Sequence, residues 1–188
     1  MPSWSVEKVL RLLQTPKYSS DSCDLFNLLK KALFLTALAT GNRVSEIGAM
    51  WLPLRAENSQ LRIPVKPGFL YKNQRVGRSP PDIIIKSLPE NRSLCPVTAL
   101  NLYIGRDRRS SGPLFVNSKS KRPIKAPSVS SIICNLIEEA DPGQMPKAHD
   151  LRKKAASLAW ARGLKVQEIT NRAFWSSSDV FISRQMYQ

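Results

Sequence analysis

The sequence is organised around residues 25–47, which read LFNLLKKALFLTALATGNRVSEI. Apolar side chains recur there at intervals of three and four from Leu25 to Ala39, the spacing of a helix with a buried face. Gly41 follows at the position where a left-handed residue commonly ends a helix. Asn42 is a suitable N-cap for a second helix over residues 43–50, which places Arg43 in its first turn. The stretch therefore predicts two consecutive helices, the second opening on an arginine.

Outside this stretch, helical segments flank a region of short strands. Helical spacing covers residues 6–14, 96–104, 128–140, 149–162, 166–174 and 178–186. Short β-like pieces occur at 61–65, 69–71, 82–85 and 114–117, with prolines and glycines between them. We predict a mainly α-helical domain with a small antiparallel β-sheet insert, an α+β fold. Residues 1–20 are expected to form a short N-terminal helix and linker packed on the domain of residues 21–188.

Net charge points to a polyanionic partner. The 188 residues carry 29 Lys and Arg against 14 Asp and Glu, a net charge of +15, while 42% hydrophobic residues are enough to fill a core. Such a basic but well-patterned chain favours nucleic acid as the partner, with an anionic membrane surface as the second choice. The three scattered cysteines indicate a reducing compartment, and the apolar runs are too short to span a bilayer. We expect a protein that is neither secreted nor inserted in a membrane.

Composition also limits the chemistry. A single histidine and the absence of cysteine pairs argue against a zinc site, and no glycine-rich phosphate-binding motif occurs. Sparse carboxylates argue against a two-metal nuclease. We therefore expect no metal and no cofactor.

Cations concentrate in two stretches. Residues 106–125 contain seven cations against one acid, Asp107, and residues 147–172 contain another seven against Asp150 and Glu168. A charge run is often only a solvated face, but two such runs in so basic a chain favour contact with a phosphate backbone, with affinity that falls steeply with salt. The candidate contacts are Arg106, Arg108, Arg109, Lys119, Lys121, Arg122, Lys125, Lys153 and Lys154.

Two helix starts carry side chains suited to bind an anion. His149 and Arg152 open the helix over 149–162, for which Asp150 is a plausible N-cap. Arg43 opens another, and two arginines at helix starts can clamp one phosphate. Glu46 lies one turn beyond Arg43, where it can orient Arg43 or His149. In isolation, His149 is better explained as an ordinary neighbour of the cap, and the alternative role of Glu46 is a surface salt bridge.

These motifs, in their order and spacing, resemble those of tyrosine recombinases of the phage-integrase type. Residues 40–47 (TGNRVSEI) look like the first arginine motif of that family, and residues 149–157 (HDLRKKAAS) look like its HxLR motif. Residues 174–177 (FWSS) resemble its later His/Trp box, and Tyr187 is the single tyrosine that follows. The resemblance covers residues 25–188 and implies the catalytic-domain fold of DNA breaking-rejoining enzymes. Residues 69–74 (FLYKNQ), 80–81 (PP) and 173–178 (AFWSSS) look most like recombinases of DIRS-type and Crypton-type mobile elements.

The resemblance implies a role for each matched residue. Tyr187 would attack the scissile phosphate of double-stranded DNA, which gives a 3′-phosphotyrosine and a free 5′-hydroxyl. Arg43 and Arg152 would stabilise the charge of the transition state, with Glu46 in support, while His149 would assist proton transfer and Trp175 would donate to a phosphate oxygen. Lys72 would protonate the departing 5′-oxygen, a role for which Lys66 and Arg75 are rivals. Neither metal nor ATP is required.

The resemblance also bears on assembly and on extent. It implies a homo-oligomer on DNA, a tetrameric synapse in this family, and a nuclear location for a eukaryotic element, otherwise cytoplasm or nucleoid. Tyr187 lies twelve residues after Trp175, a longer gap than the family usually has. A DNA-binding module with a degenerate, inactive recombinase fold is therefore the alternative. We expect a catalytic domain without the family's core-binding domain and exchanging C-terminal helix.

Overall fold

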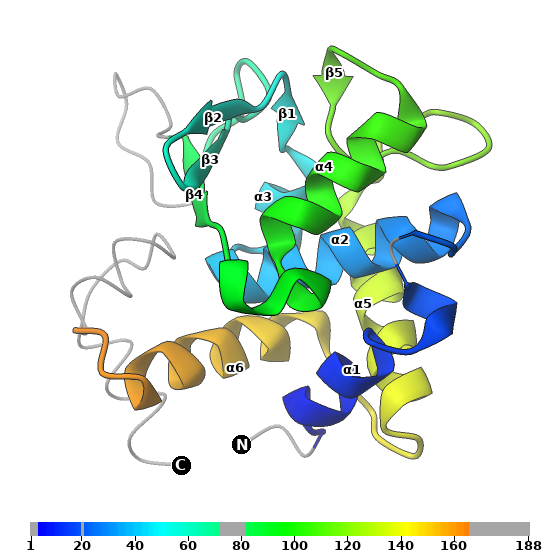
Figure 1. The fold of residues 1–188 in the computed structure, drawn as a ribbon, viewed down its shortest axis with the longest axis vertical. Helices are drawn as coiled ribbons and strands as arrows, with labels where there is room; N and C mark the ends of the chain where they lie inside the picture. The colour runs from blue at the N-terminus through cyan, green and yellow to red at the C-terminus, as the bar shows by residue number, and fades with distance from the viewer. Residues whose placement is uncertain (1–3, 20, 72–81, 166–188) are drawn as a thin grey trace.

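A computed structural model describes residues 4–19, 21–71 and 82–165. Helices pack around one long central helix, and a small sheet covers one side of it (Figure 1). The helices are α1 (Val6–Leu12), η1 (Pro16–Tyr18, 3-10), α2 (Leu25–Thr40), α3 (Val44–Gly48), η2 (Pro89–Leu94, 3-10), α4 (Pro96–Asp107), α5 (Ala126–Ala140) and α6 (Ala148–Ala161). The strands are β1 (Trp51–Leu52), β2 (Arg55–Glu57), β3 (Gln60–Ile63), β4 (Ile83–Lys86) and β5 (Gly112–Pro113). The predicted α+β class is confirmed.

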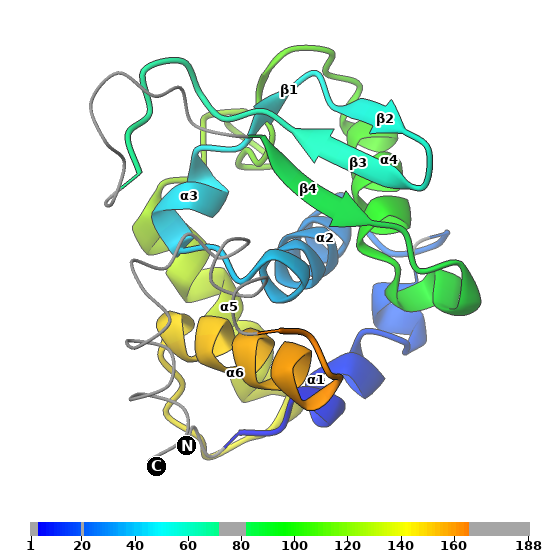
Figure 2. The same ribbon diagram turned by 90° about the vertical axis from the view of Figure 1, so that its left-hand side faces the viewer.

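Helix α2 is the centre of the core. It begins at the N-cap Asp24, whose carboxylate accepts from the backbone N–H of Asn27, and it ends at Gly41 in the left-handed conformation (φ 63°). Figure 2 shows α2 nearly end-on in the middle of the molecule, with the sheet above it and α5 and α6 below. Residues on most sides of α2 are buried, as expected for a helix that other elements surround.

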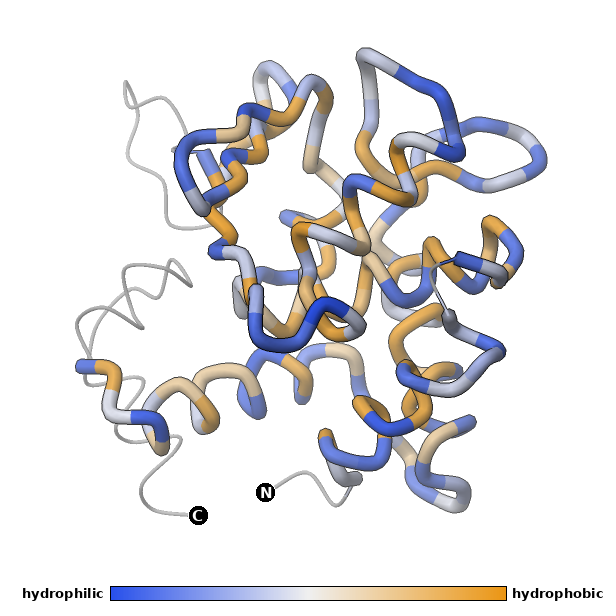
Figure 3. The backbone as a smooth tube through the Cα atoms, in the orientation of Figure 1, coloured by the Kyte–Doolittle hydropathy of each residue, from blue (hydrophilic) through white to orange (hydrophobic). Residues whose placement is uncertain are grey.

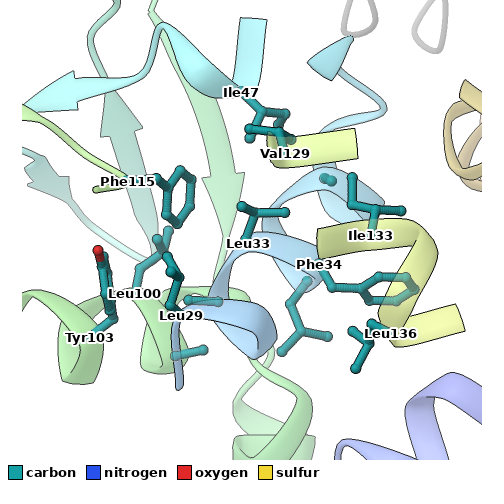
Figure 4. Close-up of a cluster of buried hydrophobic side chains, with 14 of the residues drawn as sticks. Leu29, Leu33, Phe34, Ile47, Leu100, Tyr103, Phe115, Val129, Ile133 and Leu136 are labelled. Carbon is teal, nitrogen blue, oxygen red and sulfur yellow. The ribbon is translucent and has the colours of Figure 1, made fainter. Parts of the chain in front are cut away.

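Two groups of apolar side chains pack on opposite sides of α2. Phe34 lies against Ile133 and Leu136 of α5, whereas Leu29 faces Leu100 of α4 (Figure 4). The hydropathy of the chain agrees with this core: apolar segments lie toward the inside of the molecule, and most loops are hydrophilic (Figure 3). Among the residues that the structure describes, no helix is both long and apolar enough to cross a membrane.

The insert is an antiparallel sheet of order β2-β3-β4, and β1 pairs separately with β5. Strands β3 and β4 agree with the predicted pieces at 61–65 and 82–85. The strand predicted at 69–71 is wrong: a turn at residues 66–69 is closed by the Phe69 N–H, which donates to the Lys66 carbonyl (3.0 Å), and residues 69–71 form no regular structure. Strand β2 escaped prediction: its residues are all exposed, and pairing with β3 across Asn58, in the left-handed conformation, makes it a strand. The strand predicted at 114–117 is displaced: β5 covers residues 112–113 and so begins two residues earlier.

A buried lysine fastens the N-terminal segment to α2. The Nζ atom of Lys31 donates to the backbone carbonyls of Leu13 and Tyr18, 2.9 Å from each, and the residue is only 1% exposed. Carboxylates at the end of α5 hold the same segment: Glu139 accepts from the Tyr18 hydroxyl at 2.8 Å, and Asp141 pairs with Lys8 at 2.5 Å. Residues 4–19 are thus an integral layer of the domain.

Candidate active site

The start of α3 positions Arg43 through Glu46. Arg43 is the N-cap of α3, and its backbone N–H donates to Oε2 of Glu46 at 2.8 Å. Its guanidinium donates to Oε1 of the same carboxylate, again at 2.8 Å. The sequence predicted Asn42 as the N-cap and Arg43 in the first turn. Both predictions are wrong by one residue, because Arg43 is itself the N-cap. Asn42 is buried before the helix, and in the described part of the chain its side-chain amide has no hydrogen-bond partner.

Helix α6 brings a second arginine to the same carboxylate. Nη1 of Arg152 lies 3.9 Å from Oε2 of Glu46, and the Arg152 side chain is 11% exposed while that of Glu46 is 1% exposed. Arg43 comes from the start of α3 and Arg152 from α6, so the Glu46 carboxylate brings together two arginines that are distant in sequence. We call Arg43, Glu46 and Arg152 the arginine centre.

The arginine centre carries more positive than negative charge. Burial and the nearby Arg43 lower the pKa of Arg152 to about 10, and the Glu46 carboxylate opposes this shift. Two guanidiniums share one carboxylate, so the centre holds a net positive charge in a poorly solvated place. Such a group stabilises an added anion strongly, because the low local dielectric screens the attraction little.

Tyr71 also belongs to this region, although the sequence pattern does not mark it as a site residue. Its side chain is buried, and burial together with the nearby carboxylates of Glu46 and Asp82 raises its phenol pKa. Its ring packs edge-on against Phe69, with 5.3 Å between the centroids. The one signal in the sequence is its position immediately before Lys72 in the motif of residues 69–74.

His149 occupies the second position of α6, but its side chain is 61% exposed. Its Nε2 lies 3.3 Å from Oδ1 of Asp150. The helix begins one residue earlier than expected, with Lys147 as N-cap; Asp150 is therefore the third helical residue, and its carboxylate accepts from the Lys147 backbone N–H at 3.2 Å. The prediction that Asp150 is the N-cap is wrong, while an acid in the first turn still favours the helix.

Three predicted catalytic residues, Lys72, Trp175 and Tyr187, lie outside the described residues, as do the helices predicted at 166–174 and 178–186. Of the rivals of Lys72, Arg75 also lies outside them, whereas Lys66 is held beside α3 by a backbone hydrogen bond to Ala49 at 2.7 Å. Within residues 4–19, 21–71 and 82–165, no cluster of His, Cys, Asp or Glu is suited to hold a metal ion.

The basic stretch 106–125 divides into two sets of cations. Three of them bind protein groups: Arg106 donates to the carbonyls of Cys23 and Asp21, Arg109 binds Asp107 and the carbonyls of Pro113 and Leu114, and Lys121 binds Asp107 at 2.6 Å. The other four, Arg108, Lys119, Arg122 and Lys125, are exposed. From α6, Lys153 lies 3.4 Å from Asp150, and Nζ of Lys154 lies 5.6 Å from the centroid of the Trp4 ring. Binding of the DNA phosphate backbone by any of these side chains stays a prediction.

Asp107 should be a major contributor to the stability of this loop. Burial acts to raise its pKa, but hydrogen bonds from Lys121 and Arg109 outweigh burial and keep the pKa below its usual value. We expect Asp107→Asn to lower the free energy of unfolding by about 2 kcal/mol at pH 7, less than for a fully buried pair because Lys121 is half exposed. Urea unfolding measures this loss.

The pH dependence of that loss follows from its sign. A carboxylate with a depressed pKa in the folded state stabilises the protein above its unfolded pKa, about 3.9, and the contribution disappears as the pH falls below that value. The gap between wild type and Asp107→Asn should therefore narrow steadily from about pH 5 downward. A gap that is constant over this range would show that the two cations do not bind an ionised Asp107.

The fold matches solved structures of recombinases. The XerA recombinase is 17% identical with a TM-score of 0.66, over 98% of this chain and 59% of that one. The XerH site-specific recombinase bound to its difH substrate is 17% identical with a TM-score of 0.68, over 97% of this chain and 48% of that one. The catalytic core of lambda integrase is 15% identical with a TM-score of 0.57, over 92% of this chain and 90% of that core.

The comparisons are structural, since no protein-family model and no curated protein sequence matches the chain. The chain spans about half the length of XerA and XerH, 59% and 48%, but nearly the whole lambda catalytic core, 90%. The extent of the match and the helical architecture with its small antiparallel sheet lead to one conclusion. The chain has the fold of a tyrosine recombinase catalytic domain.

Proposed function

We propose that this chain is the catalytic domain of a site-specific recombinase that cleaves and rejoins double-stranded DNA through a phosphotyrosine link. The observation that carries the proposal is the arginine centre: two guanidiniums, from α3 and α6, lie on one buried carboxylate. Arginine binds phosphate oxygens in pairs of parallel hydrogen bonds, so two arginines held in place match one phosphodiester.

In the proposed reaction, the Tyr187 oxygen attacks the scissile phosphorus, and its proton passes to His149, the residue that assists proton transfer. The bond from phosphorus to the 5′-oxygen breaks, and Lys72 gives that oxygen a proton. The 3′-phosphate remains on Tyr187, so the energy of the phosphodiester is kept, and attack by a 5′-hydroxyl reverses the step. Arg43 and Arg152 stabilise the charge that develops on the non-bridging oxygens, while Glu46 keeps both guanidiniums in position.

His149 and Trp175 complete the proposed donor set. The imidazole of His149 is exposed at the start of α6, where it can assist proton transfer or donate a hydrogen bond to a phosphate oxygen. The Trp175 indole N–H is a donor to a phosphate oxygen.

The motifs of the sequence also suggest the type of recombinase. Because they resemble those of DIRS-type and Crypton-type mobile elements, we assign the protein to recombinases of these elements, acting as an oligomer on DNA in the nucleus.

A nicked duplex tests the chemistry directly. A pool of duplexes with randomised sequence and a nick near the cleavage position lets the 5′-hydroxyl fragment diffuse away, which traps the covalent intermediate. We expect a protein–DNA adduct that survives denaturation, is absent in Tyr187→Phe, and maps to Tyr187 by mass spectrometry. DNA affinity of Tyr187→Phe should equal that of the wild type, because the phenol contributes little to binding many phosphates.

The alternative function has a distinct outcome. The twelve-residue gap between Trp175 and Tyr187 favours a non-cleaving module that kept the fold. Such a module binds the duplex tightly at low salt, forms no adduct, and responds to Tyr187→Phe in no measurable way. A wild type that behaves so would refute the cleavage reaction while leaving DNA binding intact.

A further inference from the structure

The loop between α4 and α5, residues 108–125, carries positive charge without any acid of its own. It contains six cations and no Asp or Glu. The loop extends from the end of α4, away from the C-terminal end of α6 (Figure 1). Its outer parts are hydrophilic (Figure 3), while Leu114, Phe115 and Val116 in its middle are buried. Mutual repulsion of so many cations makes the loop unfavourable unless some of them are neutralised.

Internal bonds neutralise part of the charge and shape the loop. Arg109 and Lys121 both bind Asp107, the last residue of α4, whose side chain is 1% exposed. Arg109 also donates to the Leu114 carbonyl at 2.9 Å, so one guanidinium fastens the first half of the loop. A tight turn follows, in which the Asn117 N–H donates to the Arg122 carbonyl at 2.9 Å and the Lys121 N–H donates to the Asn117 carbonyl at 2.9 Å.

The end of the loop is joined to α3. A Cβ atom at Gly48, the last residue of α3, would lie 3.1 Å from the Ile124 carbonyl oxygen, so glycine allows a close approach there. Lys125 then serves as the N-cap of α5. The loop is thus anchored at Asp107, at its turn and at α3, and its ordering has been achieved before any partner arrives.

The remaining cations point to the partner. Among the described residues, the side chains of Arg108, Lys119, Arg122 and Lys125 make no hydrogen bond or ion pair, and all four are exposed. Their charge complements a polyanion. A second copy of a chain with a net charge of +15 is a poor fit to such a surface.

We infer that these four residues form a preformed binding surface for the phosphodiester backbone of double-stranded DNA, built by Arg109, Lys121 and Asp107 beneath it. Within the basic stretch, binding and structural cations are therefore different residues. The inference rests on the proposed function for its partner, and it adds a contact surface apart from the arginine centre. Contacts of this kind give affinity and orientation without reading the base sequence.

Salt dependence of duplex binding tests the division. Removal of one cation that binds a phosphate should reduce the slope of log K against log salt by about 0.9. We expect the double variant Lys119→Gln/Arg122→Gln to lower the slope by about 2 and to weaken binding at least tenfold near 0.1 M salt, with its melting temperature unchanged. Arg106→Gln, within the same stretch but bound to the carbonyls of Cys23 and Asp21, should lower the melting temperature and leave the slope as it is.

A charge-matched control separates a local effect from net charge. Arg11→Gln/Arg92→Gln removes the same charge from exposed positions on α1 and η2, and it should leave the slope near the wild-type value. Equal slopes for the two double variants would overturn the inference. So would a change in sedimentation of the loop variant in the absence of DNA, because the surface would then bind a second copy.

The two proposals fail in different ways. A wild type that binds no duplex at any salt concentration refutes the proposed function and this inference together. A wild type that binds duplex and forms the adduct, while the loop variant keeps the full slope, refutes this inference alone.

Discussion

Arg152→Gln should reduce the rate of covalent adduct formation by a factor of about 10² to 10³. This is the effect of removing one preorganised donor from a developing negative charge, roughly 2.7–4 kcal/mol. Arg152 is almost buried beside Glu46, so water does not replace its guanidinium easily. Duplex affinity should fall less than about tenfold, because in the proposed complex Arg152 would bind only one of the many phosphates that hold the duplex. Single-turnover cleavage of the nicked duplex, together with fluorescence anisotropy, separates the two effects.

The conservative variant sharpens this prediction. Arg152→Lys keeps the charge but not the planar pair of donors, so it should remain far below the wild-type rate. Arg92→Gln, which removes a charge at an exposed position of η2, is the control and should cleave at the wild-type rate. Full activity in Arg152→Lys would mean that charge alone is needed, and full activity in Arg152→Gln would remove the arginine centre from the reaction.

Glu46→Gln should produce the largest loss of stability among single changes at the arginine centre. The substitution leaves two guanidiniums close together without their shared carboxylate, and breaking a buried ion pair in this way costs about 3 kcal/mol. For a chain of this size, that loss lowers the melting temperature by about 6–12 °C. Thermal unfolding followed by circular dichroism measures it.

Two comparisons distinguish this cause from a general effect of the change. Glu57→Gln removes a carboxylate that binds Arg62 at the surface, and it should cost less than about 1 kcal/mol. Added sulfate should raise the melting temperature of Glu46→Gln more than that of the wild type, because an anion replaces the missing charge between the arginines. If Glu46→Gln melts with the wild type and ignores sulfate, Glu46 does not hold the two arginines.

Helices with a strong period could be predicted from the sequence, and strands formed by pairing could not. The spacing from Leu25 to Ala39 and the glycine stop give the bounds of α2 almost to the residue, because local periodicity and capping act within the segment itself. Strand β2 has no such pattern. It becomes a strand because it forms hydrogen bonds with β3, and nothing in the sequence of residues 55–57 alone predicts this pairing.

The candidate site divides in the same way. The resemblance of the motifs identified Arg43 and Arg152. It did not predict that both guanidiniums lie at the Glu46 carboxylate, because that contact forms only when α3 and α6, far apart in sequence, come together in the fold. Tyr71 was missed because burial beside Glu46 is a tertiary property. The sequence likewise shows seven cations in residues 106–125 but does not show which of them bind protein groups. Only the structure separates Arg109 and Lys121, which bind Asp107, from the cations that face solvent.

Lys31 has a consequence for how the domain opens. Its ammonium donates to two carbonyls that belong to the N-terminal segment, so release of that segment alone would break both of these charge-assisted hydrogen bonds at once. Partial opening is therefore suppressed. We therefore expect residues 6–18 and α2 to behave as one cooperative unit, with the amide protons of the N-terminal segment exchanging as slowly as those of the core.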